Sequence, residues 1–216
     1  MNQRTIIFDL DGTLIHSAPD LHAAVNIALT TQGRPALDLA TVISFVGDGV
    51  EQLVKRSLMA TGDHTPALQR ETLARFMDSY DRNLTTLTRP YPGVIDCLQR
   101  LKSDGVRLGI CTNKPGSAAR RVCDQLDLTR YFDVISGAEV DQPKKPDPTS
   151  LLACIARLGG RVENAIYVGD SLVDLATAQN AHVRFHLFTG GYLNAPKPDL
   201  PPNQVFADWS SNRFCV

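Results

Sequence analysis

Two carboxylates separated by one residue follow the first apolar run of the sequence. Asp9 and Asp11 come directly after residues 5–8, a run typical of a buried strand in a parallel sheet. Acids this close repel each other, and burial raises the cost of their charges. The pair therefore indicates either a simple cap or turn, or a site that compensates the two charges.

Polar residues also follow three later apolar runs. The run "VRLGIC" precedes the first group, "FDVIS" precedes "PKKPDP", and "AIYVGD" opens the third. In open α/β sheets, ligands bind beyond the carboxyl ends of the strands, so we expect these side chains to share one edge. The candidates at that edge are Asp9, Asp11, Thr112, Asn113, Lys144 or Lys145, Asp170 and Asp174.

Counting charges at this edge indicates the chemistry. Four carboxylates and one lysine leave three negative charges in excess. A Mg²⁺ ion would balance two of them, and a carboxyl kept protonated as a general acid would balance the third. The edge therefore predicts a metal-dependent phosphoryl-transfer site. Taken singly, the motifs are more typical of a turn, a helix cap or a solvated loop, and it is their coincidence that favours catalysis.

The elements that position these residues alternate between strands and helices after residue 88. This spacing predicts an α/β fold, a doubly wound Rossmann-like parallel sheet built from residues 1–15 and 88–216. Residues 16–87 show only helical periodicity, in segments 17–33, 47–62 and 66–87, and predict an inserted all-helical cap domain. We expect Ser17 and Asp20 to form a capping box, and Asp48 to be a possible N-cap.

Two sequence features near the C-terminus predict irregularity. The segment "QNAHVR" lacks the glycine expected after a helix, so its turn should be unusual. The short tail "QVFADWSSNRFCV" leaves the last edge of the sheet open.

Composition excludes several classes of function. The formal net charge is −1 and no basic run is interleaved with aromatics, which argues against nucleic-acid binding. No long apolar run indicates a membrane segment, and the N-terminus lacks a secretory pattern. The scattered cysteines favour core positions in a reducing cytoplasm; they are Cys97, Cys111, Cys123, Cys154 and Cys215.

The motifs "DLDGT", "CTNK", "KPDP" and "GDSLVD", in this order, resemble those of the haloacid dehalogenase superfamily in its phosphatase branch. More narrowly, "DLDGTLIHSAPDL", "FVGDGVEQLVKRSL", "YPGV" and "TGGY" are similar to segments of the phosphoglycolate phosphatase family. The resemblance covers essentially the whole chain. It implies an Mg²⁺-dependent phosphatase, a monomer or homodimer, that acts on a small phosphorylated metabolite. The first candidate substrate is 2-phosphoglycolate.

The resemblance also implies roles for the edge residues. Asp9 would be the nucleophile that forms an aspartyl-phosphate, and Asp11 the general acid and then base. Thr112 and Lys145 would hold the phosphate oxygens, Lys145 being chosen over Lys144 because it directly precedes the P-x-P of the pattern. Backbone N–H groups near Leu10, Gly12 and Asn113 would also bind the phosphate oxygens. Mg²⁺ would be bound by Asp9, Asp170 and the main-chain carbonyl of Asp11, with Asp174 behind them orienting Lys145 or a metal-bound water.

The insertion is expected to close over the site and read the organic part of the substrate. Its loop from Gly47 to Gly49 is a candidate contact because glycine permits close backbone approach, although a turn between helices explains it equally well. His16 stands where many relatives have an acid. We expect its side chain either to be exposed or to pack against its neighbours.

Other functions remain open on these motifs. A phosphosugar mutase or another sugar phosphatase would share all four of them. A metal-free dehalogenase would not need the acid at Asp11, and a phospho-accepting signalling module would carry its acid on a middle strand without an insertion.

Overall fold

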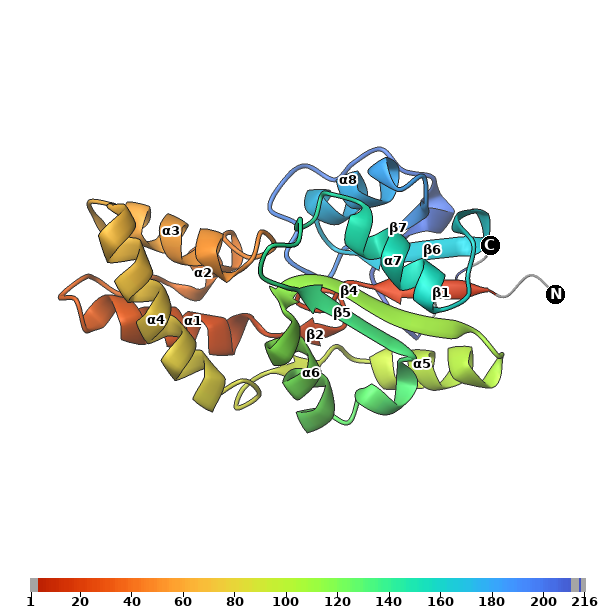
Figure 1. The fold of residues 1–216 in the computed structure, drawn as a ribbon, viewed down its shortest axis with the longest axis horizontal. Helices are drawn as coiled ribbons and strands as arrows, with labels where there is room; N and C mark the ends of the chain where they lie inside the picture. The colour runs from red at the N-terminus through yellow and green to blue at the C-terminus, as the bar shows by residue number, and fades with distance from the viewer. Residues whose placement is uncertain (1–3, 211–213, 215–216) are drawn as a thin grey trace.

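The computed structural model describes residues 4–210 and Phe214. Its centre is a parallel six-stranded sheet of order β5-β4-β1-β6-β7-β8, with β1 in the middle (Figure 1). The strands are β1 Thr5–Phe8, β4 Arg107–Pro115, β5 Val134–Ala138, β6 Ala165–Gly169, β7 Arg184–Phe188 and β8 Val205–Phe206. The connecting helices are α5 Val94–Ser103, α6 Gly116–Gln125, α7 Thr149–Arg157 and α8 Leu172–Asn180, with short 3₁₀ turns at Thr129–Tyr131, Val162–Asn164 and Pro202–Gln204.

Helices cover both faces of this sheet. Alternate residues of β1 point to opposite sides, so Ile6 and Phe8 pack in the layer that holds α5 and α6, whereas Ile7 packs in the layer of α7 and α8. Figure 1 shows α7 and α8 on one side of the sheet and α5 and α6 on the other. The predicted doubly wound α/β fold is confirmed.

Between β1 and α5 the chain forms four more helices. They are α1 Ala18–Thr30, α2 Leu39–Ile43, α3 Val50–Thr61 and α4 Pro66–Arg82, and they lie together to one side of the sheet in Figure 1. The two segments that enter and leave this helical insertion pair as a short antiparallel ribbon, β2 Ile15–His16 with β3 Arg89–Pro90. The sequence predicted neither the ribbon nor α2, because two-residue strands and a five-residue helix are too short to show a period.

The predicted Ser17–Asp20 capping box is wrong. Ser17 is the N-cap of α1 but makes no side-chain cap bond. The Asp20 carboxylate instead accepts hydrogen bonds from Leu87 N at 3.0 Å and from Thr88 N at 2.8 Å and Thr88 Oγ1 at 2.6 Å. Buried carboxylates need several donors, and the returning strand supplies more of them than the helix terminus can. Asp20 thus fastens the end of the insertion to its beginning.

Two further local predictions are corrected in the insertion. The helix expected over residues 66–87 ends at Arg82, since residues up to Thr88 turn back to meet Asp20, and Leu87 is left 53% exposed. Gly49, not Asp48, is the N-cap of α3, because the Asp48 carboxylate pairs with Arg56 at 2.5 Å.

The C-terminal segment completes the sheet edge that the sequence left open. Strand β8 pairs with β7, and the side chains of Trp209 and Phe214 are buried against Phe8. The described cysteines are buried in the core without a disulfide among them, as expected, and Cys215 lies outside the described residues. Among residues 4–210, no helix combines the length and apolar character that crossing a bilayer requires.

The turn after α8 is unusual, as the missing glycine predicted. His182 has φ of 55°, the left-handed conformation that glycine normally supplies at a helix end. The residue at the equivalent position, directly after the C-cap of α7, is Gly159, with φ of 68°. Hydrogen bonds from His182 N to the Gln179 carbonyl (3.1 Å) and from Val183 N to the Ala178 carbonyl (2.9 Å) fix the conformation.

His182→Gly is therefore expected to raise the free energy of unfolding by about 0.5–1 kcal/mol, because glycine adopts this conformation without the Cβ clash. His182→Ala keeps the clash and serves as the matched control. Urea denaturation at neutral pH measures both. A glycine variant no more stable than the alanine variant would contradict the account.

His186 on β7 is a buried imidazole. Its side chain is 1% exposed, neither ring nitrogen has a hydrogen-bond partner within the described part of the chain, and it lies 5.6 Å from the Phe214 ring. Burial, with a smaller effect of the nearby Arg184 charge, lowers the pKa of His186 from 6.5 to about 4.

This pKa predicts sensitivity to acid. The unfolded chain binds a proton near pH 6.5 and the folded chain only near pH 4, so the neutral imidazole's contribution is complete above pH 6.5 and is lost as pH falls toward 4. The full difference corresponds to about 3 kcal/mol. His186→Leu should remove that part of the pH dependence in urea titrations between pH 7 and 4.5. A variant with the same pH dependence as the wild type would contradict this.

Candidate active site

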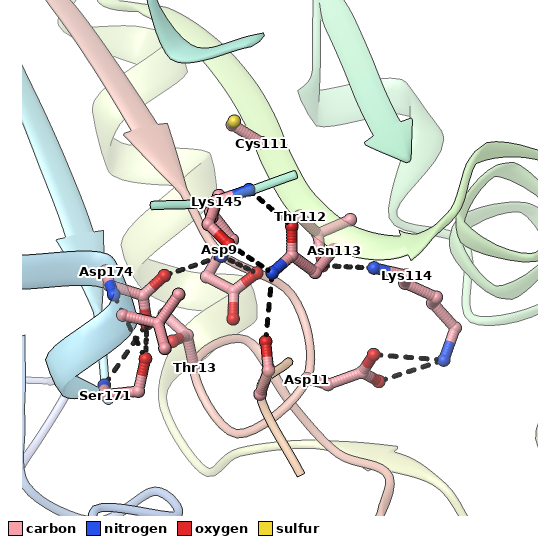
Figure 2. A network of polar contacts seen from close by, with 12 residues as sticks. Asp9, Asp11, Thr13, Cys111, Thr112, Asn113, Lys114, Lys145, Ser171 and Asp174 are labelled. Atoms are coloured by element: carbon pink, nitrogen blue, oxygen red, sulfur yellow. Dashed lines mark hydrogen bonds and ion pairs between the residues drawn. The ribbon is translucent and has the colours of Figure 1, made fainter. Parts of the chain in front are cut away.

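Strand ends bring Asp9, Lys145 and Asp174 into one buried ion-pair cluster. Lys145 Nζ lies 2.9 Å from Asp9 Oδ1 and 2.6 Å from Asp174 Oδ1, and also donates to the Tyr167 hydroxyl at 2.9 Å. Figure 2 shows Lys145 reaching between the two carboxylates. Asp9 follows β1, Tyr167 lies on β6, and Asp174 lies in the first turn of α8, so neighbouring segments at one sheet edge supply the cluster.

Asp170 lies at the same edge with both carboxylate oxygens hydrogen-bonded. Thr13 Oγ1 donates to Oδ1 at 2.5 Å, and the Tyr192 backbone N–H donates to Oδ2 at 2.7 Å. Gly12 is in the left-handed region, with φ of 88°, and a Cβ there would lie 2.4 Å from Asp170 Oδ2. Gly12 is therefore needed for the close approach of the "DLDGT" turn to Asp170, and Thr13 binds that carboxylate in addition to forming part of the turn.

Asp174 is the most fully engaged of these acids. Its Oδ1 atom meets Lys145 Nζ and the Tyr167 hydroxyl (2.9 Å), and its Oδ2 atom accepts from Ser171 N at 3.2 Å and Ser171 Oγ at 2.5 Å. The Ser171–Asp174 contacts form a reciprocal capping box at the start of α8. The side chain of Asp174 is thus committed to holding Lys145 and the helix terminus.

Burial and crowding perturb the pKa values of the cluster. Burial raises the pKa of Asp9 to about 6, although Lys145 opposes this, and burial together with Asp174 and Asp9 raises that of Asp170 well above its usual range. Burial disfavours the charge of Lys145, but Asp174 and Asp9 outweigh it and hold its pKa above the usual value.

This cluster fits a divalent cation. Oxygen atoms of Asp9, Asp170 and Asp174 all lie within 4.8 Å of one another, and all three residues are buried. Within the described part of the chain, Lys145 is the only cation paired with any of these acids, through Asp9 and Asp174, so the three acids carry excess negative charge when ionised. Oxygen donors and excess negative charge are what hard cations such as Mg²⁺ select.

Asp11 does not join this cluster. Its carboxylate points away from Asp9 and toward Lys114, whose Nζ lies 3.0 and 3.1 Å from the two oxygens (Figure 2). Lys114 Nζ also donates to the hydroxyl of Tyr80 on α4 and lies 4.8 Å from the centre of that ring. A buried lysine thus links the second acid of "DLDGT" to the helical insertion.

A cleft between the sheet edge and the insertion contains the remaining candidates. Its sheet side is lined by Asp9, Asp11, Thr112, Asn113 and Lys114, and its insertion side by Leu21, Val46, Gly47, Gly49, Val50 and Leu53. The Asn113 amide crosses between the two sides, donating to the Gly47 carbonyl and the Lys145 carbonyl, both at 3.2 Å, while its Oδ1 accepts from Lys145 N at 2.9 Å. The structure therefore brings Gly47 and Gly49 to the site.

Lys144 and His16 lie outside the acid cluster. Lys144 pairs with Glu51 on α3 and its side chain is 34% exposed, in contrast to the buried Lys145. His16 is half-buried, with Nδ1 3.0 Å from the Tyr192 hydroxyl and its ring beside those of Tyr91 and Tyr192. Of the two alternatives that the sequence left for His16, exposed or packing, the structure shows packing.

Sequence reasoning missed three side chains that contact the candidate acids: Lys114, Tyr80 and Tyr167. Lys114 ends the quoted "CTNK" motif, and a lysine that continues a buried strand is itself a signal. Tyr80 fell on the inward stripe of its helix and Tyr167 in a buried strand, so both were interpreted as core. Their hydroxyl groups were the available signal, because a buried tyrosine usually binds a partner.

Comparison with known proteins identifies the class. Residues 6–188 match the sequence model of the haloacid dehalogenase-like hydrolases, and the chain belongs to this family of hydrolases.

The names of individual relatives specify an activity within this family. The phosphoglycolate phosphatase of Cereibacter sphaeroides is 46% identical over 203 residues, covering 94% of this chain and 92% of that enzyme. Phosphoglycolate phosphatase 1 of Pseudomonas aeruginosa is 41% identical, covering 88% of this chain and 70% of that one. A crystal structure of a predicted phosphoglycolate phosphatase from Haemophilus somnus superposes with a TM-score of 0.89 at 28% identity, covering 97% of this chain and 96% of that chain.

Proposed function

We propose that this chain is an Mg²⁺-dependent phosphoric monoester hydrolase that converts 2-phosphoglycolate to glycolate and phosphate. The observation that carries the proposal is the buried Asp9–Lys145–Asp174 cluster beside Asp170 at the carboxyl end of the sheet. The names of relatives up to 47% identical support the substrate. The enzyme acts as a monomer or homodimer, and a cytoplasmic location remains a prediction from its scattered cysteines.

Asp9 is the nucleophile of this mechanism. Its carboxylate attacks phosphorus, the bond to the leaving oxygen breaks, and an aspartyl-phosphate forms on Asp9. Lys145, held by Asp174 and Tyr167, keeps a positive charge 2.9 Å from the attacking carboxylate and neutralises phosphate oxygens. Asp174 thereby acts through Lys145 and is a positioning residue.

Asp11 is the general acid and then the general base of this mechanism. It donates a proton to the leaving glycolate oxygen and later takes one from the water that attacks the phosphorus of the aspartyl-phosphate. Thr112 Oγ1 and the backbone N–H groups near Leu10, Gly12 and Asn113 bind the phosphate oxygens.

Asp9, Asp170 and the main-chain carbonyl of Asp11 would hold the Mg²⁺ ion. Asp170 and Asp9 have oxygen lone pairs to offer, whereas the Asp174 oxygens are occupied by Lys145, Tyr167 and Ser171. When bound, the ion supplies positive charge against the phosphate as negative charge develops on it.

Residues 16–87 form the cap domain of this account, and residues 1–15 and 88–216 the catalytic core. Packing of α1 with α4 and of α3 with α4, and the β2–β3 ribbon at the junction, support this division. The apolar side chains Leu21, Val50 and Leu53 exclude water from the cleft, and the Gly47–Gly49 loop approaches the substrate.

Chelation tests the metal dependence. Treatment with EDTA followed by its removal should abolish phosphate release from 2-phosphoglycolate, and Mg²⁺ added back should restore it. Circular dichroism before and after chelation controls for unfolding. Full activity in EDTA, with the fold intact, would sink the proposed mechanism.

A further inference from the structure

Lys114 is a second buried lysine at the candidate site, distinct from Lys145 in its surroundings. Its side chain is 2% exposed, and among the described residues that line the cleft it is the only cation. The mechanism above requires a charge near the phosphate, which Lys145 supplies, and leaves Lys114 without a role.

Protein groups satisfy all three N–H bonds of the Lys114 ammonium. Two contact the Asp11 carboxylate and the third reaches the Tyr80 hydroxyl. Lys114 is therefore ionised and positioned, with its charge balanced by one carboxylate. Burial raises the pKa of Tyr80 to about 12, so its hydroxyl stays neutral and does not take part in that balance.

The ion pair turns Asp11 away from Asp9, as Figure 2 shows. A carboxyl held this way is directed away from a phosphate at Asp9. The insertion side of the cleft offers apolar side chains and the backbone of the Gly47–Gly49 loop, none of which carries a charge. Among the described residues that line the cleft, only Lys114 would therefore offer a cationic partner to a second negative group on a substrate.

We propose that Lys114 is a specificity-determining residue that binds a carboxylate on the substrate in exchange for the carboxylate of Asp11. The exchange keeps the Lys114 charge paired, and the released Asp11 carboxylate takes up one proton from solvent, so no buried charge is left uncompensated. It also frees Asp11 to turn toward the leaving oxygen. A substrate that lacks the second anion leaves Asp11 on Lys114 and reacts slowly. The inference rests on the proposed phosphatase function and adds the reason for a preference for phosphorylated carboxylic acids.

A pair of substrates that differ in one group tests the exchange. Ethyl phosphate carries a methyl group where 2-phosphoglycolate carries its carboxylate. With wild-type protein and Mg²⁺, kcat/KM should be much higher for 2-phosphoglycolate. Lys114→Met should lower kcat/KM for 2-phosphoglycolate about 100-fold, the order expected when a buried charged partner is lost. It should not lower kcat/KM for ethyl phosphate, because Lys114 no longer holds Asp11.

Three further variants separate this role from a structural one. Lys114→Arg keeps the charge and should retain most of the preference for 2-phosphoglycolate, which also provides a test if the methionine variant does not fold. Tyr80→Phe removes the hydroxyl that holds Lys114 and should reduce the preference several-fold. Lys144→Met, a nearby lysine that does not line the cleft, should leave both substrates unaffected.

Different results would refute the carboxylate exchange at Lys114 and the proposed phosphatase function. Equal losses on both substrates in Lys114→Met would show that Lys114 only supports Asp11, and the exchange would be wrong while the phosphatase function stands. Wild-type protein that cleaves both esters equally well would also refute the exchange. Wild-type protein that releases phosphate from neither ester would refute the proposed function itself, and the inference with it.

Discussion

Asp9→Asn is expected to lower phosphate release from 2-phosphoglycolate by at least about 10⁴-fold, because an amide cannot attack phosphorus as a carboxylate does. The asparagine has nearly the same shape, so the effect is chemical. Burial already raises the pKa of Asp9 to about 6, and removing its charge leaves fewer carboxylates to repel one another. The variant should therefore be at least as stable to heat as the wild type.

Asp147→Asn is the matched control for this substitution. Asp147 lies in the neighbouring "KPDP" loop, where its carboxylate accepts from the Thr149 backbone N–H, and it does not line the cleft. Its loss should change activity less than about twofold. Retention of more than about 1% of wild-type activity by Asp9→Asn, with the control unaffected, would exclude Asp9 as the nucleophile.

Lys145→Met should have the second-largest effect, on both activity and stability. The lysine side chain is 3% exposed and pairs with Asp9 and Asp174, so its loss leaves buried carboxylates without their cation. Breaking such a pair typically costs about 3–5 kcal/mol. We expect at least a 10³-fold loss of phosphate release, about the scale of removing one positive group from a phosphoryl-transfer site.

Lys144→Met provides the comparison, since the two lysines are adjacent in sequence. Lys144 is paired with the half-exposed Glu51, and exposed pairs contribute at most about 1 kcal/mol. Urea denaturation and phosphate release should separate the two variants clearly. Equal effects of the two substitutions would mean that the choice of Lys145 over Lys144 is wrong.

The edge of the sheet could be predicted because its signals are local. Asp9, Thr112 and Asp170 each follow an apolar run, and the rule that ligands bind beyond parallel strand ends brings them together without any long-range information. The doubly wound fold followed from the same alternation of strands and helices.

Contacts between distant segments could not be predicted in this way. Asp20 accepts hydrogen bonds from Leu87 and Thr88 instead of capping its own helix, and this depends on where the insertion returns to the core. The bridge from Asp11 through Lys114 to Tyr80 joins residues 11, 114 and 80, and no period or motif links them. Single-sequence patterns report which face of an element is buried, and not which buried polar groups will meet.

The end of α8 lies between these cases. The missing glycine in "QNAHVR" signalled an irregular turn, and the structure has His182 in the left-handed conformation there. The physical rule identified the position, while the hydrogen bonds that impose the conformation required the structure.

The most direct test of the central claim is a comparison of kcat/KM for 2-phosphoglycolate with that for a panel of sugar phosphates and other small phosphate esters, with Mg²⁺ and with EDTA. The account predicts that 2-phosphoglycolate gives the highest kcat/KM and that no ester is hydrolysed in EDTA. A sugar phosphate preferred over 2-phosphoglycolate, or a phosphosugar isomerised without release of phosphate, would contradict it.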